Sequence, residues 1–332
     1  MPELRIGIVG ASGLVGQTLL RVLEEHAFPY RELRLFASEQ SAGQEVFVNE
    51  EFLQIQEISP RALEGLDLVF FVSTNAVSLK WAPVAVEKGA LVIDNSKAYR
   101  MEPTVPLIVP EINGSTLFEN MGIIANPNCS TVQTVLSLYP LHKAFGLKRV
   151  VVSTYQAVSG SGKQALEQLR SERSGKTPPE TVYPHPIFNN CLPHIGTFLE
   201  NGYTDEEMKM VNESRKILGL PDLRVTATTV RVPVEYSHSI SVNVELEADF
   251  SLDQVYRILE EMPGIIVKDD PSQNLYPLSA LAKDRDEVFV GRIRRDFSVA
   301  SGLNYWVVAD NLRKGAATNA LQIAEYWLRH KP

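Results

Sequence analysis

The sequence predicts an α/β protein of two domains, the first built on an open, mostly parallel sheet and the second, an α+β domain, on a mostly antiparallel sheet. Three observations favour this architecture. The chain has 332 residues, which is long for one compact domain and sufficient for two full cores. The first third alternates short apolar segments with helical patterns. The middle contains longer segments in which polar and apolar residues alternate.

Composition excludes several classes of protein. The chain carries 32 basic and 40 acidic residues, for a net charge of −8, and the basic residues are scattered rather than clustered. This argues against nucleic acid or an anionic membrane as the partner. No apolar run approaches a membrane span, and the N-terminus lacks the features of a signal peptide. Two distant cysteines then favour reduced thiols in the cytoplasm over a disulfide.

The first third has the βα alternation of a parallel sheet. An apolar run, Ile6 to Val9, meets glycines and then a helical pattern with Val15, Leu19, Val22 and Leu23 on one face. The remaining segments are short and often β-branched, as strands buried on both faces are. Including the first, the expected strands are Leu4–Val9, Leu33–Ala37, Leu68–Val72, Leu91–Ile93 and Ile123–Ala125.

The middle of the chain predicts a different sheet. Its expected strands are Val150–Tyr155, Val225–Val232, Ser239–Glu247, Val288–Arg294 and Asn304–Ala309. Its expected helices are Gln164–Arg173, Asp205–Leu218 and Leu252–Glu261. The Pro- and Asn-rich segment Gly175–Pro193 predicts a long irregular loop. The helical pattern Lys314–Arg329 is expected to return to the first domain. We therefore expect residues 1–129 with 311–332 to form one domain and residues 130–310 the other.

A glycine-rich loop lies between the first strand and the first helix. Its residues are Gly10, Ser12, Gly13, Leu14, Val15 and Gly16, with Ala11 among them. Glycine allows a tight turn and a close approach to a pyrophosphate, whose charge is favoured at a helix N-terminus. The position of the loop thus predicts a Rossmann-type dinucleotide-binding domain. The alternative is a tight βα turn without a ligand.

The end of the second strand bears on which dinucleotide binds. Ser38 and Ser41 can donate hydrogen bonds to a 2′-phosphate, whereas the carboxylate of Glu39 repels phosphate and suits a free 2′-hydroxyl. No acidic residue ends the strand itself. The segment favours NADP and leaves NAD open.

Cys129 is the candidate nucleophile. It follows Asn126-Pro127-Asn128 and opens a helix that carries Val132, Val135, Leu136 and Tyr139. A cysteine in the first helical turn lies at the positive end of the helix dipole, which lowers the thiol pKa and supplies N–H groups for an oxyanion. Asn128 is expected to cap this helix. The alternative is a small buried core cysteine.

The run Asn126 to Thr131 resembles the active-site motif of aspartate-semialdehyde dehydrogenases, and the resemblance extends over essentially the whole chain. The further matching segments are Gly10–Gly16, Ser96–Arg100, Val105–Asn113, Thr154–Gly160, Glu206–Lys209, Arg231–Ser239 and Lys314–Ala317.

The resemblance implies a reaction. It is the reversible reduction by NADPH of L-4-aspartyl phosphate to L-aspartate 4-semialdehyde and phosphate, in the biosynthesis of lysine (through diaminopimelate), threonine and methionine. Cys129 matches the nucleophile that forms a thioester. His238 matches the acid–base catalyst, and Gln156 matches the residue that positions the substrate. A cysteine–histidine pair suits thiolate attack and proton transfer near neutral pH.

The resemblance also assigns binding residues. Arg231 matches the residue that binds the substrate α-carboxylate, and Glu206 the carboxylate that receives its ammonium. Arg100 and Lys209 match phosphate-binding cations. The positions that match cofactor contacts are Ser159, Gly160 and Asn311.

Two local patterns refine these assignments. Residues seven apart on an unbroken strand face opposite sides, so the chain between Arg231 and His238 must interrupt the strand if both reach one pocket. Thr204 and Glu207 form a capping-box pattern, which leaves Glu206 outside the cap.

The chain departs from the family at one notable position. Gln40 stands where many members have the arginine that binds the 2′-phosphate, which weakens the case for strict NADP use. The related N-acetyl-glutamyl-phosphate reductases and a catalytically silent nucleotide-binding paralogue remain alternative interpretations. The resemblance implies a homodimer or homotetramer. No metal site is expected, because His185, Cys191 and His194 lack a fourth ligand.

Overall fold

The computed structural model describes residues 4–331. By its internal contacts the chain divides into two compact units, Met1–Pro127 with Ala316–Pro332, and Asn128–Gly315. The first break therefore lies just before Cys129, and the second follows Gly315. Both ends of the second unit carry residues that matter for the candidate site.

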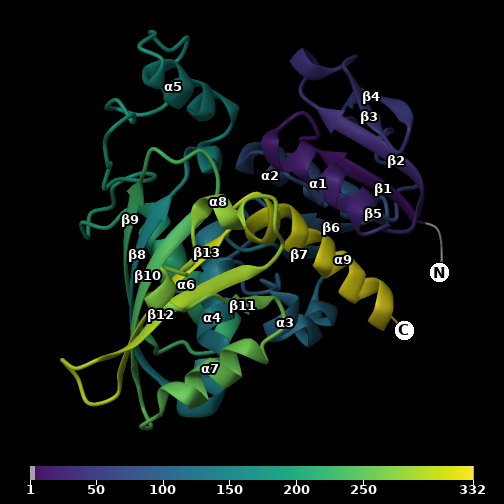
Figure 1. Cartoon of the computed structure of the whole chain (residues 1–332). Helices are drawn as coiled ribbons and strands as arrows, with labels where there is room; N and C mark the ends of the chain where they lie inside the picture. Colours follow the sequence, from purple (N-terminus) through teal and green to yellow (C-terminus); the bar gives the residue numbers. More distant parts are fainter. Residues whose placement is uncertain (1–3, 332) are drawn as a thin grey trace. The chain divides into compact units, whose positions relative to one another are not determined.

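The first unit is built on a sheet that, within the described residues, has seven strands in the order β3-β4-β2-β1-β5-β6-β7 (Figure 1). The strands are β1 (Leu4–Val9), β2 (Tyr30–Ala37), β3 (Glu45–Val48), β4 (Glu51–Glu57), β5 (Leu68–Phe71), β6 (Leu91–Asp94) and β7 (Ile123–Ala125). Only the pairing of β3 with β4 is antiparallel among them. The sheet order changes direction on either side of β1, so the carboxyl end of β1 is a topological switch point.

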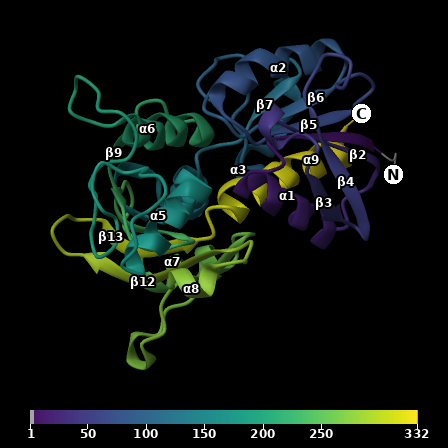
Figure 2. The ribbon, with the colours of Figure 1, turned by 90° about the horizontal axis from the view of Figure 1, so that it is seen from above.

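Helices cover this sheet. Helix α1 (Leu14–Glu25) buries Leu19, Val22 and Leu23, as its apolar pattern predicts, and α2 (Asn75–Glu87), which was not expected, packs on β5 and β6. The C-terminal helix α9 (Thr318–His330) packs against α1, β6 and the short helix α3 (Pro110–Asn113) (Figure 2). The end of the chain therefore belongs to the first unit.

The second unit is built on a six-stranded sheet, counted within residues 128–315, in the order β11-β12-β13-β10-β8-β9. The strands are β8 (Leu147–Gln156), β9 (Arg224–Arg231), β10 (His238–Leu246), β11 (Ile265–Val267), β12 (Val288–Asp296) and β13 (Gly302–Ala309). The three central pairings are antiparallel, whereas the edge pairs β8–β9 and β11–β12 are parallel. The prediction of a mostly antiparallel sheet is confirmed.

Helix α4 (Cys129–Phe145) packs across the second sheet and against α6 (Asp205–Leu218) and α7 (Leu252–Glu260). The capping box of Thr204 and Glu207 at the start of α6 is present as predicted. Helix α5 (Lys163–Arg173) leads into a segment without regular helix or strand, which extends to the start of α6. The predicted long loop is confirmed and is longer than expected.

Several features differ from the sequence-based expectations. The antiparallel hairpin β3–β4, the short edge strand β11, helix α2 and the short helices α3 and α8 (Ser279–Ala282) were not expected. The helical pattern that starts at Lys314 begins as a π-helical turn, Arg313–Ala317, before α9 continues it. The turn of the hairpin explains why the hairpin was missed, because Asn49 and Glu50 both have positive φ, +46° and +67°. Glutamate rarely adopts that conformation, so the sequence carries no usual turn signal.

Candidate active site in the second unit

Three predicted site residues lie at one edge of the second sheet. Strands β8 and β9 run parallel, and their last residues, Gln156 and Arg231, are register partners. Strand β10 runs antiparallel to β8 and begins at His238, next to the pairing of Ser239 with Tyr155. Two strands therefore end where the third begins, and this topology brings three polar side chains to the same edge.

The chain between Arg231 and His238 leaves the sheet, as the side-chain period requires. Residues 232–237 belong to no strand, and Ser237, at the end of this segment, has a φ of +72°. Both flanking side chains then face Gly160. A Cβ at Gly160 would lie 3.1 Å from Nη1 of Arg231 and 3.2 Å from Cε1 of His238. Glycine at this position lets the chain pass close to both.

Cys129 is the first residue of α4, and Asn128 caps the helix as predicted. The Asn128 side chain accepts hydrogen bonds from the N–H groups of Ser130 at 2.9 Å and Thr131 at 3.3 Å. These two N–H groups are therefore engaged by the cap rather than available to an oxyanion. Sγ of Cys129 lies 3.2 Å from Nε2 of His238. The structure thus places a thiol at the positive end of a helix dipole, in contact with an imidazole.

His238 is completely buried, and both its ring and its backbone are held by hydrogen bonds. Its Nδ1 accepts the backbone N–H of Ala157 at 3.0 Å, and its backbone carbonyl accepts Nε2–H of Gln133 at 3.2 Å. Because Nδ1 is an acceptor, the neutral ring carries its hydrogen on Nε2, facing Cys129. Burial holds the pKa of His238 well below its ordinary value, and the nearby Arg231 cation lowers it further. The neutral ring is therefore the resting form, poised to donate to a thiolate.

Glu206 is buried and links several predicted site residues. Its carboxylate accepts hydrogen bonds from Nδ2 of Asn128 at 2.9 Å and, more weakly, from Nε2 of Gln156 at 3.4 Å. Nζ of Lys209 lies 2.9 Å from the same carboxylate and 3.3 Å from Asp205. Burial by itself raises the pKa of Glu206, but the ion pair with Lys209 and the bond from Asn128 outweigh it, so that the pKa lies below its ordinary value. Glu206 is charged, and its hydrogen bond with Asn128 stabilises the N-cap of α4.

A second buried carboxylate, Glu213, was not predicted. Its Oε2 accepts the backbone N–H of Asn128 at 2.7 Å, and the residue is 1% exposed. Glu206 and Glu213 are seven residues apart on α6 and so share a helical face. The seven-residue spacing is visible in the sequence and predicts a shared helical face for the two carboxylates.

Arg231 is a buried cation close to both Glu206 and His238. Its Nη1 donates to the carbonyl of Ala157 at 2.6 Å, and its guanidinium lies 5.9 Å from the ring centroid of Tyr183. Nε of Arg231 has no hydrogen-bond partner within the described residues. A planar cation with an unused donor can bind a carboxylate.

Ser159 and Asn311 lie close to His238 and contact each other. Their side chains are joined by hydrogen bonds of 3.0 and 3.1 Å, and Oδ1 of Asn311 also accepts the backbone N–H of Ser237 at 3.0 Å. In the second unit the structure therefore brings together ten predicted site residues: Asn128, Cys129, Gln156, Ser159, Gly160, Glu206, Lys209, Arg231, His238 and Asn311.

In the first unit, the glycine loop packs too closely on its surroundings to accept a side chain at Gly10 or Gly16. Gly10 has a φ of +96°, and a Cβ there would lie 2.5 Å from the carbonyl oxygen of Val72. A Cβ at Gly16 would lie 2.3 Å from the Gly10 carbonyl oxygen. Gly13 occupies the N-cap position of α1 and provides no side-chain cap, and Leu14 and Val15 form its first turn. The loop is thus open to a phosphate at the helix N-terminus.

The serines expected near the adenosine ribose lie together. Oγ of Ser12, in the glycine loop, donates to Oγ of Ser41 at 3.3 Å. Ser38 precedes the short 3₁₀ turn Glu39–Ser41 that follows β2. The side chain of Gln40 lies outside the described part of the structure. Two hydroxyl groups at the ends of β1 and β2 can serve a 2′-phosphate or a ribose hydroxyl.

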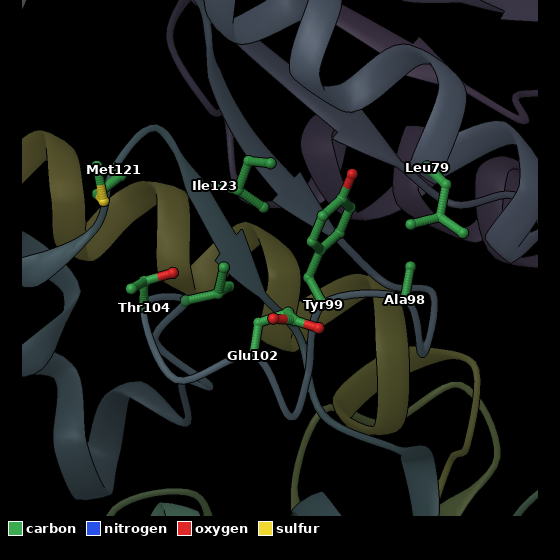
Figure 3. Close-up of a pocket in the computed structure, with 8 residues that line it drawn as sticks. Leu79, Ala98, Tyr99, Glu102, Thr104, Met121 and Ile123 are labelled. Atoms are coloured by element: carbon green, nitrogen blue, oxygen red, sulfur yellow. The ribbon is translucent and has the colours of Figure 1, made fainter.

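Arg100 belongs to the first unit and follows β6. It is buried, and its Nη2 donates to the carbonyl of Asn95 at 2.7 Å. The adjoining segment lines a hollow together with Leu79 of α2 (Figure 3). The described residues around this hollow include Tyr99, Glu102 and Met121 but no basic side chain. The hollow is therefore unsuited to phosphate, and the phosphate-binding assignment in this unit rests on Arg100 alone.

Among residues 4–331, no three or more His, Cys, Asp or Glu side chains gather in a way that could hold a metal ion. None of the helices described combines the length and hydropathy needed to cross a bilayer. Cys129 and Cys191, both in the described range, are not joined in a disulfide.

A Rossmann-type unit joined to a unit with a cysteine–histidine pair defines a class of enzyme, the nicotinamide-dependent dehydrogenases that act through a thiol. Family models agree with this class. Residues 5–120 match the semialdehyde dehydrogenase NAD binding domain, and residues 138–314 match the semialdehyde dehydrogenase dimerisation domain.

Individual relatives narrow the class to one family. The chain is 50% identical over 329 residues to the aspartate-semialdehyde dehydrogenase of Aquifex aeolicus, with 97% of each chain covered. It is 47% identical over 334 residues to that of Bacillus subtilis, covering 97% of this chain and 96% of the relative. The chain belongs to the aspartate-semialdehyde dehydrogenase family.

Solved structures agree in fold. The crystal structure of aspartate semialdehyde dehydrogenase II of Vibrio cholerae complexed with ASA has a TM-score of 0.96, 42% identity and full coverage of both chains. The Candida albicans aspartate semialdehyde dehydrogenase with NADP has a TM-score of 0.77 and 26% identity, covering 98% of this chain and 99% of that one. Both the fold class and the family predicted from sequence are confirmed.

Proposed function

We propose that this chain catalyses the reversible, NADPH-dependent reduction of L-4-aspartyl phosphate to L-aspartate 4-semialdehyde and phosphate. The observation that carries the proposal is the 3.2 Å contact between Sγ of Cys129 and Nε2 of His238 at the start of α4. Family membership supports the choice of substrate. The reaction belongs to the biosynthesis of lysine, threonine and methionine, and two cysteines that form no disulfide with each other suit a reducing cytoplasm.

The chemistry runs through Cys129. Its thiolate attacks the carbonyl carbon of the acyl phosphate, the bond from that carbon to the phosphate oxygen breaks, and phosphate leaves a thioester behind. When bound, the reduced nicotinamide supplies the hydride that the thioester carbon accepts. The carbon–sulfur bond then breaks, which releases the semialdehyde and restores the thiolate.

His238 stabilises the sulfur in this scheme. With Nδ1 bound to the N–H of Ala157, Nε2–H is the donor that faces Cys129 and favours its thiolate form. Accepting a proton at Nε2, as the oxidative direction requires, needs the tautomer with hydrogen on Nδ1. In that tautomer the hydrogen on Nδ1 points at the N–H of Ala157, so neither group can accept a hydrogen bond from the other. We therefore expect the contact between Ala157 and His238 to open when His238 acts as a base.

The substrate is bound by charges of both signs. Arg231, with its unused Nε donor, is proposed to bind the α-carboxylate, and Gln156 to orient the acyl group beside Cys129. Glu206 is proposed to receive the ammonium, which then joins the interactions that Lys209 and Asn128 already make with this carboxylate. Lys209 and Arg100 are proposed to bind phosphate.

The cofactor is proposed to bind the glycine loop of the first unit, at Gly10, Ser12, Gly13, Leu14, Val15 and Gly16. The steric limits at Gly10 and Gly16 and the paired hydroxyls of Ser12 and Ser41 support this placement. We infer that NADP is preferred over NAD, with Ser38, Gln40 and Ser41 near the 2′-phosphate. Ser159, Gly160 and Asn311 are proposed to contact the cofactor from the second unit.

We infer that the protein forms a homo-oligomer, a dimer or a tetramer, through residues 138–314, because these match a dimerisation domain. Sedimentation velocity at micromolar concentration tests this inference. A monomer at that concentration contradicts it.

Two other functions are less well supported. An N-acetyl-glutamyl-phosphate reductase has a substrate without a free ammonium, and it would not need the buried charge of Glu206. A silent nucleotide-binding paralogue would not need a thiol held against an imidazole. The relatives named above are all aspartate-semialdehyde dehydrogenases and favour neither alternative.

A steady-state assay separates these possibilities. Aspartate semialdehyde or N-acetyl-glutamate semialdehyde is supplied with phosphate and with NADP or NAD in parallel. We expect phosphate-dependent formation of NADPH with aspartate semialdehyde. Turnover only with the acetylated substrate supports the reductase, and no turnover with either supports the silent paralogue.

A further inference from the structure

His238 is preceded by a strained residue that holds it in place. Ser237 has a φ of +72°, a left-handed conformation that costs free energy for any residue with a Cβ. Ser237 is completely buried, and its Oγ has no hydrogen-bond partner among the described residues. Its own side chain therefore does not stabilise this conformation, so the surroundings must.

Asn311 supplies a contact that stabilises the conformation of Ser237. Its Oδ1 accepts the backbone N–H of Ser237 at 3.0 Å. Asn311 is 2% exposed, and its own side chain is oriented by Ser159, 3.0 Å away. The backbone N–H of Ser159 in turn donates to the carbonyl of Glu235 at 3.1 Å, in the same turn as Ser237. The turn before His238 is thus tied to Asn311 from two directions.

The segment that carries Asn311 also touches Cys129. At one end, Ala309 is the register partner of His238. At the other, the N–H of Gly315 donates to the carbonyl of Asp310 across the π-helical turn, at 3.2 Å. A Cβ at Gly315 would lie 2.9 Å from Cβ of Cys129. Residues 309–315 therefore contact both members of the thiol–imidazole pair, and π-helical turns often occur at functional sites.

We propose that Asn311 is a positioning residue for His238: by holding the N–H of strained Ser237, it sets the contact between the imidazole and Cys129. The inference rests on the proposed function and adds to the cofactor contact expected of Asn311. A cofactor contact acts only when the dinucleotide is bound. A positioning role acts in the free enzyme as well, and the two are therefore separable.

The test uses the free enzyme and a double-mutant cycle. The variants are Asn311→Ala, Ser237→Gly and the pair combined. The matched control is Asn304→Ala, because Asn304 lies on strand β13, which leads to Asn311. Asn304 bonds to Asn243 rather than to the site. The rate of Cys129 alkylation by iodoacetamide is measured from pH 5 to 9 without cofactor, and kcat and the KM for NADP are measured separately. Circular dichroism melting monitors folding.

Asn311→Ala is expected to slow cofactor-free alkylation near neutral pH and to lower kcat by about tenfold, with less change in the KM for NADP. Glycine adopts positive φ without strain, so Asn311→Ala is expected to cost several-fold less in the Ser237→Gly background. Asn304→Ala is expected to leave the alkylation profile unchanged.

Two results overturn the proposal. One is an unchanged alkylation profile in Asn311→Ala with a raised KM for NADP, which leaves only a cofactor contact. The other is a loss from Asn311→Ala that is equal with and without the Ser237→Gly substitution. If Asn311→Ala does not fold, the combined variant is compared with Ser237→Gly alone, because glycine relieves the strain that Asn311 is proposed to hold. The two are expected to alkylate near pH 7 within about threefold of each other, and a larger difference also overturns the proposal. A parent enzyme without turnover would contradict the proposed function, whereas the alkylation readout would still test the positioning role.

Discussion

Replacing Asn128 tests how the helix cap positions the nucleophile. The Asn128 side chain accepts two N–H groups of α4 and donates to the buried carboxylate of Glu206. Loss of an N-cap side chain costs about 1 kcal/mol. Loss of a hydrogen bond to a charged group costs about 1–3 kcal/mol, and the lower end applies here because Lys209 still pairs with Glu206. Asn128→Ala is therefore expected to lower the free energy of unfolding by about 2 kcal/mol.

Asn128→Ser separates the two contributions, because serine caps a helix but is too short to replace the amide donor. We expect it to cost about 1 kcal/mol, half the loss in the alanine variant. Ser251→Ala is the matched control, since Ser251 caps α7 with a capping box and lies on the exposed surface. It is expected to cost about 1 kcal/mol as well.

The assays are urea unfolding and the pH dependence of Cys129 alkylation. In Asn128→Ala the first turn of α4 loses its cap, so we expect alkylation to require a higher pH. Ser251→Ala should leave alkylation unchanged. Equal stability of the alanine and serine variants would contradict the role of the Glu206 contact. An alkylation midpoint that moves no further in Asn128→Ala than in Ser251→Ala would contradict the role of the cap.

Three further predictions concern charge. Arg231→Lys keeps the cation but loses the planar fork, and it should raise the KM for aspartate semialdehyde about tenfold or more; an unchanged KM would remove Arg231 from the carboxylate site. The pKa of His238 is lowered in the folded state, so below its ordinary value of 6.5 the unfolded chain binds a proton that the folded chain does not. Stability should therefore fall as pH drops below about 6.5, less steeply in His238→Gln, as urea titrations at several pH values would show. Gln40→Arg should raise the NADP over NAD ratio of kcat/KM about tenfold, and an unchanged ratio would contradict the placement of the 2′-phosphate.

The regular elements were predictable where burial dictated the pattern. Strands β1, β5 and β7 are apolar on both faces, and α6 carries a complete capping box, so each was expected close to its observed bounds. The hairpin β3–β4 was not expected, because most of its side chains are exposed and its turn places Glu50 at positive φ. In such a segment the strands form because they pair with neighbouring strands in the folded chain, and the local sequence pattern does not predict them.

The candidate site was predictable in its reactive residues but not in its supports. A cysteine in a capped first turn leaves a local signal in the sequence, whereas His238 was assigned through the family resemblance of its segment. By contrast, two of the supporting hydrogen bonds are donated by backbone N–H groups. The N–H of Ala157 donates to His238, and the N–H of Asn128 donates to Glu213. Backbone donors have no residue-type signature, so only the folded chain reveals these contacts.

The role of Cys129 as nucleophile is tested by phosphate-dependent turnover of aspartate semialdehyde by the parent enzyme and by Cys129→Ala, each with NADP. We expect NADPH formation that requires phosphate in the parent, is lost in the variant, and disappears from the parent in step with alkylation of Cys129. Normal turnover by Cys129→Ala would contradict this role.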